Sequence, residues 1–213
     1  MTLNEELYQV ADELRAVASL GLRFSENGYD KERYEKILRL SAQLVAAIED
    51  HSPDEILQQY SGNFSHVSPL VVVETAVFRE GKILLIRRHD NGLWAIPGGL
   101  SEVGETTSQA ALRELWEEAG IHGEVKKILG IFDSRLWKMS SKMHLFAFLY
   151  LVESGEEPHL HPIDPESSAS FFESLDVGFF SEDQLPELSP GHDTRVPFIF
   201  KLYRNEIPVP YFD

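Results

Sequence analysis

Three glutamates stand in one short window of the chain at a spacing that could bind a metal ion. Glu114, Glu117 and Glu118 are separated by three and four residues, so on an α-helix their carboxylates share one face. Like charges at these spacings destabilise a helix by roughly 0.2–0.5 kcal/mol per pair, and Arg113, four residues before Glu117, offsets only part of that cost. Because clustered carboxylate oxygens suit a hard cation, the window predicts a Mg²⁺ or Mn²⁺ site.

The residues before this helix complete the predicted site. Gly98 and Gly99 let the backbone turn tightly and leave carbonyl groups that can join the ligands of the metal. Glu105 stands at the predicted helix entry, where it can pair with Arg113 and hold the loop against the helix. An ordinary solvated acidic face is the alternative. It is disfavoured because the window's residue types coincide by chance on the order of once in 10⁷ starting positions.

The glutamates of this window can act together only if a helix and a sheet hold them in place. A helix is predicted over Thr107 to Ala119, with Gly120 as a left-handed end and Leu115 among the residues facing the sheet. Apolar and β-branched runs bounded by turn residues predict the strands. These strands are Leu70 to Phe78, Lys82 to Arg88, Leu93 to Ile96, Gly123 to Ser134, His144 to Val152 and Ser174 to Phe180. A closing helix is expected over Thr194 to Arg204, and an exposed loop over Glu153 to Ser170.

The fold class follows from this order of elements. Strands broken by two helices and several hairpin turns favour a mixed α/β sandwich over a parallel doubly wound sheet. The chain before them reads as helical, with a capping-box start at Thr2 and further starts at Asp30 and Ser52; the stretch Gly21 to Gly28 is expected to break the first helix. We therefore expect a small all-α N-terminal domain over 1–64 and an α/β domain over 65–213.

The charge and cysteine content of the chain disfavour several classes of binding partner and site. The 213 residues carry a formal net charge of −16, which disfavours binding to duplex nucleic acid or to an anionic membrane. No cysteine is present, so disulfides, thiolate zinc sites and a cysteine nucleophile are excluded. The sequence shows no signal-peptide pattern and no apolar run long enough to span a bilayer. A cytoplasmic protein is expected.

The glutamate window resembles a known family motif. Gly99, Glu105, Arg113-Glu114, Glu117-Glu118 and Gly120 stand at the spacing of the Nudix box without a departure. Residues from about 70 to 205 resemble the whole Nudix domain, an α/β/α sandwich with a mixed sheet. The resemblance implies divalent-cation-dependent hydrolysis of a nucleoside diphosphate linked to another moiety, giving a nucleoside monophosphate and a phosphorylated product.

The resemblance also implies the ligands of the metal. Carried over by position, Glu114, Glu117 and Glu118 are metal ligands, helped by a carbonyl of Gly98 or Gly99.

Further roles are implied for residues around these ligands. Arg113 and Glu105 orient the ligands, and Glu173 matches a loop glutamate that binds metal or acts as base in related enzymes. Either Glu118 or Glu173 would accept the proton of the attacking water. An ordinary loop acid is the alternative for Glu173.

The N-terminal segment resembles the helical leader of a bacterial Nudix subgroup. Glu13-Leu14-Arg15-Ala16 and the run from Asp30 to Tyr34 carry this resemblance, and the tail from Glu173 to Ser189 agrees with it. The subgroup includes CDP-choline pyrophosphatases and ADP-ribose hydrolases, which implies a small-molecule nucleoside diphosphate substrate. The apolar stripes and small core of the leader predict a homodimer.

Cationic residues at one strand end are candidates for phosphate binding. Arg87, Arg88 and His89 lie beside the glycine-rich turn, although a surface strand end explains them nearly as well. Trp94 is expected to pack in the core.

Two further groups are weaker candidates. Phe132, Trp137 and Lys138 could stack on a nucleobase, but core or interface packing is favoured for them. His159 and His161 are interpreted as solvent-exposed residues rather than a metal pair.

Two other functions stay open. One is hydrolysis of nucleoside triphosphates or RNA ends; the other is a non-catalytic nucleotide-sensing module with a DNA-binding leader. The acidic surface disfavours long RNA, and residues 1–63 hold 6 basic against 12 acidic side chains, which disfavours DNA.

Overall fold

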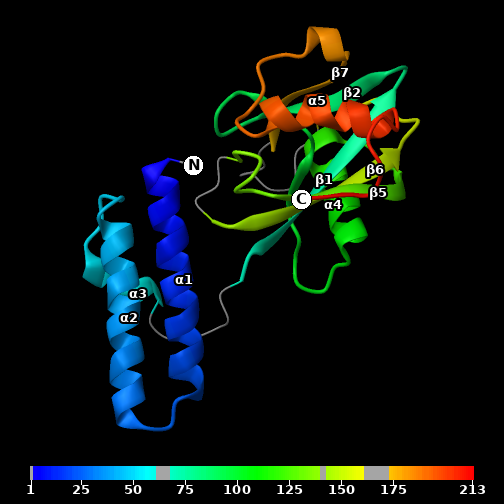
Figure 1. The fold of residues 1–213 in the computed structure, drawn as a ribbon. Coiled ribbons are helices and arrows are strands. Elements are labelled where there is room, and N and C mark those ends of the chain that lie inside the picture. Colours follow the sequence, from blue (N-terminus) through cyan, green and yellow to red (C-terminus); the bar gives the residue numbers. More distant parts are fainter. Residues whose placement is uncertain (1, 61–67, 140–142, 161–172) are drawn as a thin grey trace, which may run out of the picture. The chain divides into compact units, whose positions relative to one another are not determined.

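The computed structural model describes residues 2–60, 68–139, 143–160 and 173–213. Its contacts divide the chain into two compact units: residues 1–69 with 141–144, and residues 70–140 with 145–213. Among the described residues, the first unit holds helices α1, α2 and α3, and the second holds the sheet with helices α4 and α5 (Figure 1).

The helical unit is a hairpin of two long helices followed by a short one. Helix α1 spans Leu3–Phe24, α2 spans Gly28–Ala46 and α3 spans Pro53–Tyr60. Small buried residues let α1 and α2 pack closely, and the Ser41 hydroxyl donates a hydrogen bond of 2.8 Å to the Ala11 carbonyl of α1. The predicted capping boxes at Thr2 and Ser52 are confirmed.

The first helix ends within the stretch Gly21 to Gly28, as predicted: it continues through Gly21 to Phe24, and α2 begins at Gly28. The Tyr34 ring of α2 lies where a side chain at Gly21 would stand, 2.4 Å from its Cβ position. One predicted detail of this hairpin is wrong. The second helix is capped by Asn27 rather than Asp30: the Asn27 side chain accepts from the Asp30 N–H at 2.8 Å. Both residue types favour caps, so the sequence alone did not separate them.

The larger unit is built on a mixed sheet. Its strands are β1 Leu70–Arg79, β2 Lys82–Arg88, β3 Trp94–Ala95, β4 Gly98–Leu100, β5 Glu124–Asp133, β6 Leu145–Glu153, β7 Ser174–Phe180 and β8 Tyr211–Phe212. The order is β3-β2-β1-β6-β5-β8, with β4 also pairing β1 and β7 pairing β2. Strand β1 runs parallel to β6 and antiparallel to β2 and β4, which makes the sheet mixed as predicted.

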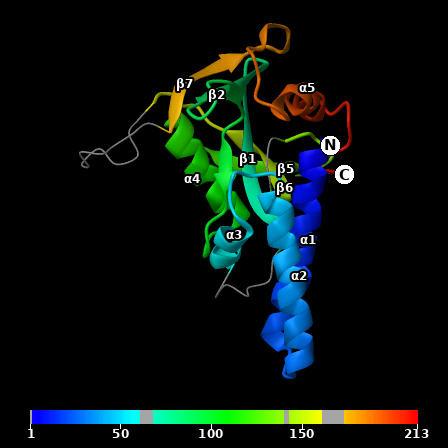
Figure 2. The same cartoon turned by 90° about the vertical axis from the view of Figure 1, so that its left-hand side faces the viewer.

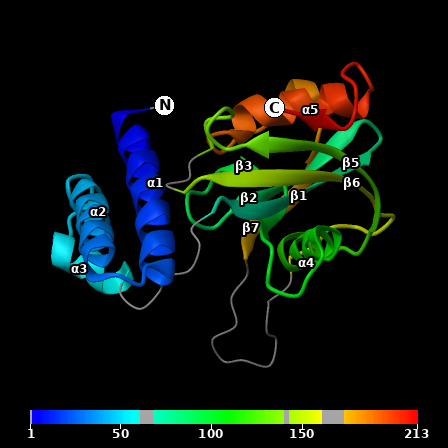
Figure 3. The ribbon, with the colours of Figure 1, turned by 60° about the horizontal axis from the view of Figure 1, so that its bottom comes forward.

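Helices cover both faces of this sheet. Helix α4 spans Thr107–Ala119, and α5 spans His192–Tyr203; Figures 2 and 3 show them on opposite sides of the strands. Alternation along β2 explains this: Ile83 and Leu85 pack in the cluster that contains α5, whereas Leu84 and Ile86 pack in the cluster that contains α4. The predicted α/β/α sandwich preceded by helices is confirmed.

Most predicted boundaries agree with the structure within one or two residues. The strand at Lys82, the helix at Thr107 and the strand at Ser174 match at both ends. Gly120 ends α4 with a φ of 66°, in the left-handed region. The loop predicted from Glu153 lies partly outside the described residues. Within the described part of the chain, no helix is long and apolar enough to cross a membrane.

Candidate active site

Helix α4 presents the glutamates of the window. It begins with a capping box in which the Thr106 hydroxyl accepts from the Gln109 N–H and the Gln109 side chain accepts from the Thr106 N–H. Its apolar stripe, including Leu115 and Ala119, is fully buried against the sheet. The rest of the helix carries Arg113 and the three glutamates, of which Glu114 is buried beside β4 and Glu118 bonds to the Gly98 amide.

Arg113 joins the helix to the loop before it. Its Nε lies 2.8 Å from Glu105 Oε1, and its Nη2 donates to the Leu100 carbonyl at 3.0 Å. Its Nη1 lies 2.9 Å from Glu114 Oε1 and 2.7 Å from Glu117 Oε2. The Arg113 hydrogen bond is the largest cause that holds the pKa of Glu105 below its usual range. The pairing of Arg113 with Glu105 agrees with the sequence prediction.

The two glycines of β4 lie close to their neighbours: a side chain at Gly98 would clash with backbone, and one at Gly99 would displace the Glu114 carboxylate. A Cβ at Gly98 would stand 2.2 Å from the Val73 carbonyl oxygen, and one at Gly99 would stand 2.6 Å from the Glu114 carboxylate. The Gly98 N–H donates to Glu118 Oε2 at 2.7 Å. Glycine at these positions lets β4 lie between β1 and the carboxylates of α4.

Three carboxylates meet beside this strand. Oxygens of Glu114, Glu117 and Glu173 lie within 4.8 Å of one another. Helical spacing predicted Glu118 as the third member of this cluster; in the structure Glu173 takes that place, and Glu118 bonds to the Gly98 amide. The family resemblance had implied a metal-binding or base role for Glu173, but spacing within one helix could not place it beside Glu114 and Glu117.

Burial changes the acidity of two of these groups. Desolvation is the largest cause that raises the pKa of Glu114 to about 7, with Arg113 opposing it. Desolvation likewise raises the pKa of Glu118 to about 8, opposed by the Gly98 N–H and increased by the charges of Glu114 and Glu173. A divalent cation, with its oxygen-preferring chemistry, fits this donor set and would supply the missing positive charge.

The cationic residues at the end of β2 are already engaged. Arg88 makes two bonds to Asp90, from Nε at 2.9 Å and from Nη2 at 2.7 Å, and Arg87 Nε donates to the Gly92 carbonyl at 2.8 Å. Hydrogen bonding to Asp90, followed by the charges of Glu118 and Glu74, raises the pKa of Arg88. The charge of Arg88 in turn acts on Glu118 and lowers its pKa, which partly opposes the effect of burial.

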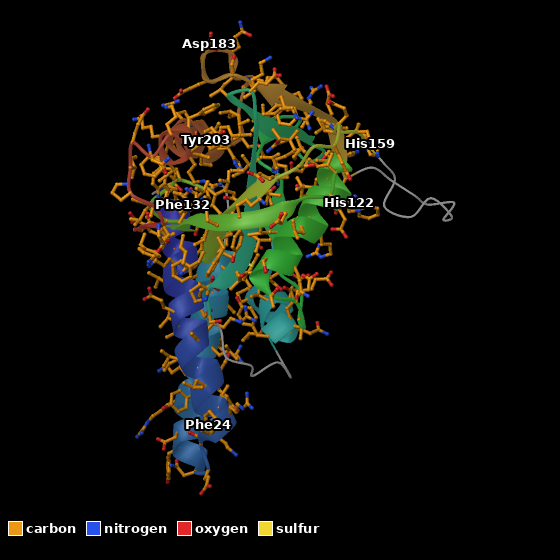
Figure 4. All side chains as sticks on the ribbon, turned by 90° about the vertical axis from the view of Figure 1, so that its right-hand side faces the viewer. Phe24, His122, Phe132, His159, Asp183 and Tyr203 are labelled. Carbon is orange, nitrogen blue, oxygen red and sulfur yellow. The ribbon has the colours of Figure 1, made fainter. Side chains whose placement is uncertain are left out.

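The aromatic candidates pack in the protein interior. Phe132 is fully buried, with the Trp137 ring 5.2 Å away edge to face, and Figure 4 places Phe132 on the ribbon of β5. The Trp137 Nε1–H donates to Asp213 Oδ1 at 2.6 Å. Trp94 packs edge to face on Phe180 at 4.7 Å. The favoured packing interpretation is confirmed for Phe132 and Trp94.

The remaining candidates lie on the surface. Lys138 is exposed, and so is His159, whose backbone N–H donates to the Ala119 carbonyl at 3.0 Å. Figure 4 shows His159 and His122 near the C-terminal end of α4. His161 lies outside the described residues.

Sequence reasoning missed a buried ion pair between β1 and α5. Glu74 of β1 and Arg195 of α5 pair with only 6% and 2% of their side chains exposed. His192 lies beside them, and burial, followed by the Arg195 charge, holds its pKa well below the usual range. One signal was available: Glu74 is the only charged residue between Leu70 and Phe78 in a strand of apolar neighbours, and buried charges require partners.

Comparison with known proteins adds to this geometry. A model described as the NUDIX domain matches residues 68–202. The chain belongs to the Nudix family. A second model, described as a UDP-X-like N-terminal oligomerisation domain, matches residues 5–59. The chain is a Nudix hydrolase, since it carries this domain and has relatives named as pyrophosphatases.

The relatives of this Nudix hydrolase extend over both units. It is 30% identical over 205 residues, 95% of each chain, to a protein named putative ADP-ribose pyrophosphatase YjhB from Bacillus subtilis. It is 32% identical over 133 residues, 60% of this chain and 71% of the other, to an ADP-ribose pyrophosphatase from Methanocaldococcus jannaschii. A crystal structure of UDP-X diphosphatase superimposes with a TM-score of 0.58 over 100% of both chains at 24% identity, which supports the fold alone.

Proposed function

We propose that this Nudix hydrolase cleaves the diphosphate bond of a nucleoside diphosphate linked to another moiety and depends on a divalent cation. The substrate class is that of ADP-ribose, UDP-linked compounds and CDP-choline, and the products are a nucleoside monophosphate and a phosphorylated partner. The carboxylate cluster of Glu114, Glu117 and Glu173, within 4.8 Å of one another, carries the proposal. The near full-length relative named as an ADP-ribose pyrophosphatase supports the substrate class.

The cluster is the proposed cation site. Glu114, Glu117 and Glu173 would hold Mg²⁺ or Mn²⁺ with a carbonyl of Gly98 or Gly99. When bound, the cation would neutralise the charge that develops on the phosphoryl oxygens and lower the pKa of the attacking water. Substrate phosphates and water are the usual further ligands of such an ion.

The other residues of the site receive roles from their contacts. Glu118, held by the Gly98 amide at 2.7 Å, accepts the proton of the attacking water in this proposal. Arg113 fixes Glu114 and Glu117 against Glu105. Arg88, whose charge is felt at Glu118, and Arg87 attract the substrate phosphates.

A substrate panel tests the proposal. Wild-type protein is assayed with ADP-ribose, UDP-sugars, CDP-choline, nucleoside triphosphates and short triphosphorylated RNA, each with Mg²⁺, with Mn²⁺ and with EDTA. We expect nucleoside monophosphate from the first three classes and loss of turnover in EDTA. Release of pyrophosphate from triphosphates at higher kcat/KM would contradict the substrate class. No turnover with any compound, together with duplex DNA retention in a gel shift, would favour the sensing module.

We further propose that the helical unit pairs two copies of the chain. Apolar side chains recur every seven residues along α1 and are exposed: Leu3 at 70%, Val10 at 45%, Val17 at 56% and Phe24 at 70%. This spacing forms one stripe along a helix. The match to an oligomerisation domain over residues 5–59 supports a second copy as the partner.

A further inference from the structure

A charged pair lies where Nudix chemistry does not require one, in the core between β1 and α5. Arg195 Nη2 donates to Glu74 Oε1 at 2.7 Å, and Nη1 bonds to Oε2. Arg195 Nε also donates to the Gly191 carbonyl at 3.2 Å. Replacing a buried ion pair by apolar residues is often neutral or stabilising, so stability alone does not account for charges at this place.

The Glu74 end of the pair lies beside β4 in the sheet. Glu74 is the register partner of Gly98 in the antiparallel β1–β4 pairing. A Cβ at Gly98 would stand 2.9 Å from the Glu74 Cα and 3.0 Å from the Glu74 Cγ. The next residue of β1, Thr75, donates its N–H to the Pro97 carbonyl at 2.9 Å. Gly98 therefore packs directly against the backbone and the first side-chain carbons of Glu74, with no room for a side chain between them.

Gly98 in turn holds a carboxylate of the site. Its N–H donates to Glu118 Oε2 at 2.7 Å. Contacts thus run without a gap from α5, through Arg195, Glu74 and Gly98, to Glu118 on α4. The pair is also neutral as a unit, so it joins α5 to the strand beside β4 without adding net charge.

We propose that Glu74 and Arg195 are positioning residues for hydrolysis: by fixing Gly98 they aim the Glu118 carboxylate. This inference rests on the proposed function. Substrate and cation contacts belong to other residues, so removal of the pair acts on kcat rather than on KM. Outer contacts that orient ligands of a metal site typically change activity or metal affinity by about 10–100-fold when removed.

The decisive variant removes both charges together. In Glu74→Met/Arg195→Met no unpaired charge stays buried, so we expect the thermal midpoint to stay near that of the wild type. We expect kcat to fall about 10–100-fold with KM changed less than about threefold. Exchange of the Gly98 amide hydrogen, followed by NMR in the cation-free protein, should accelerate at least about tenfold, because its bond to Glu118 loosens.

A matched control removes a second ion pair of α5. Arg204, at the end of that helix, pairs with Glu182 at the surface. Glu182→Met/Arg204→Met should leave kcat, KM and Gly98 exchange unchanged. Wild-type kcat and wild-type Gly98 exchange in the Glu74→Met/Arg195→Met protein would overturn the inference.

A second variant covers the case in which the double variant does not fold. Arg195→Lys keeps the charge and loses the two-pronged bond to Glu74. We expect it to fold, with kcat lowered and KM unchanged; an unchanged kcat would overturn the inference. A wild-type protein without hydrolytic activity would instead contradict the proposed function, and the Gly98 exchange would still test the positioning by itself.

Discussion

At the scale of single residues, the site combines two kinds of glutamate. Glu114 and Glu117 are tied to Arg113, with oxygens 2.9 and 2.7 Å from its Nη1. Glu118 instead accepts a hydrogen bond from the backbone N–H of Gly98. Burial raises the pKa of both Glu114, to about 7, and Glu118, to about 8, so the two kinds of glutamate differ in their contacts. We expect the glutamates held by Arg113 to bind the cation and Glu118 to transfer the proton.

The Glu118→Gln substitution tests that division. Glutamine keeps an oxygen that can accept the Gly98 N–H, so we expect the fold to persist. It cannot take a proton, so kcat should fall by about 10²–10⁴-fold. Glu102→Gln, an exposed glutamate of the preceding loop, is the control and should retain wild-type kcat. A Glu118→Gln protein with full kcat would remove Glu118 from the mechanism.

Stability of the cation-free protein should depend on pH. Folding raises the pKa of Glu114 to about 7 and of Glu118 to about 8, above the ordinary glutamate value of about 4.3. Between these values the folded chain holds more protons than the unfolded chain. The free energy of unfolding therefore decreases as pH rises from about 5 to 8 and levels off above.

Cation binding should reverse this trend. Binding displaces the same protons, so Mg²⁺ should raise the thermal midpoint more at pH 8 than at pH 6. Differential scanning calorimetry with and without Mg²⁺ measures both effects, and Glu118→Gln should flatten the cation-free profile. Equal stabilisation by Mg²⁺ at both pH values would argue against a cation among these carboxylates.

At the scale of elements, α4 and β4 act as one unit. Gly98 and Gly99 bring β4 against the carboxylates, and the capping box at Thr106 fixes where α4 begins. Gly120 then ends the helix one residue after its last sheet contact. The Nudix motif thus specifies the boundaries of an element as well as its charges.

The exposed apolar stripe of α1 leads to a prediction about the oligomeric state of the protein. Val10→Glu/Val17→Glu places two charges on the proposed pairing stripe, whose burial would be costly. Light scattering should give a mass near twice 24.2 kDa for the wild type and near 24.2 kDa for the variant. Gln43→Glu, an exposed position of α2 outside the stripe, is the control and should stay dimeric. A monomeric wild type would contradict the pairing.

At the scale of the whole molecule, the three hydrophobic clusters all lie within the second unit. They contain the buried faces of β1, β2, β5, β6, α4 and α5. The buried apolar residues of the helical unit are few and mostly small: Ala11, Ala18, Leu38, Ala42 and Ile56. Burial of apolar side chains can therefore stabilise the second unit by itself, whereas the helical unit buries too little apolar area to gain much stability from it.

We propose the domain boundary near residue 64 on this basis. A chain of residues 65–213 should fold by itself, with a cooperative thermal transition and a monomer mass in light scattering. Residues 1–64 alone should show a broad transition or none at low concentration, because so little apolar area is buried in one copy. An aggregated or unfolded 65–213 chain would contradict this boundary.

The sequence by itself determined those features that depend on local spacing. The bounds of α4, its left-handed end at Gly120 and the pairing of Arg113 with Glu105 follow from residues close along the chain. The fold class followed from the order of strands and helices. The cap of α2 did not, because Asn27 and Asp30 are both residue types that favour caps, and Asn27 takes the position.

Tertiary structure decided which groups meet across long separations. The family resemblance marked Glu173 as a candidate metal ligand or base, but its place beside Glu114 and Glu117 follows from the fold. The pairing of Arg195 with Glu74 across 121 positions also follows from the fold. Spacing rules describe one element at a time, whereas these contacts depend on strand order and on which helix covers which face. Burial, which sets the raised pKa of Glu118, likewise exists only once the sheet and both helices have packed.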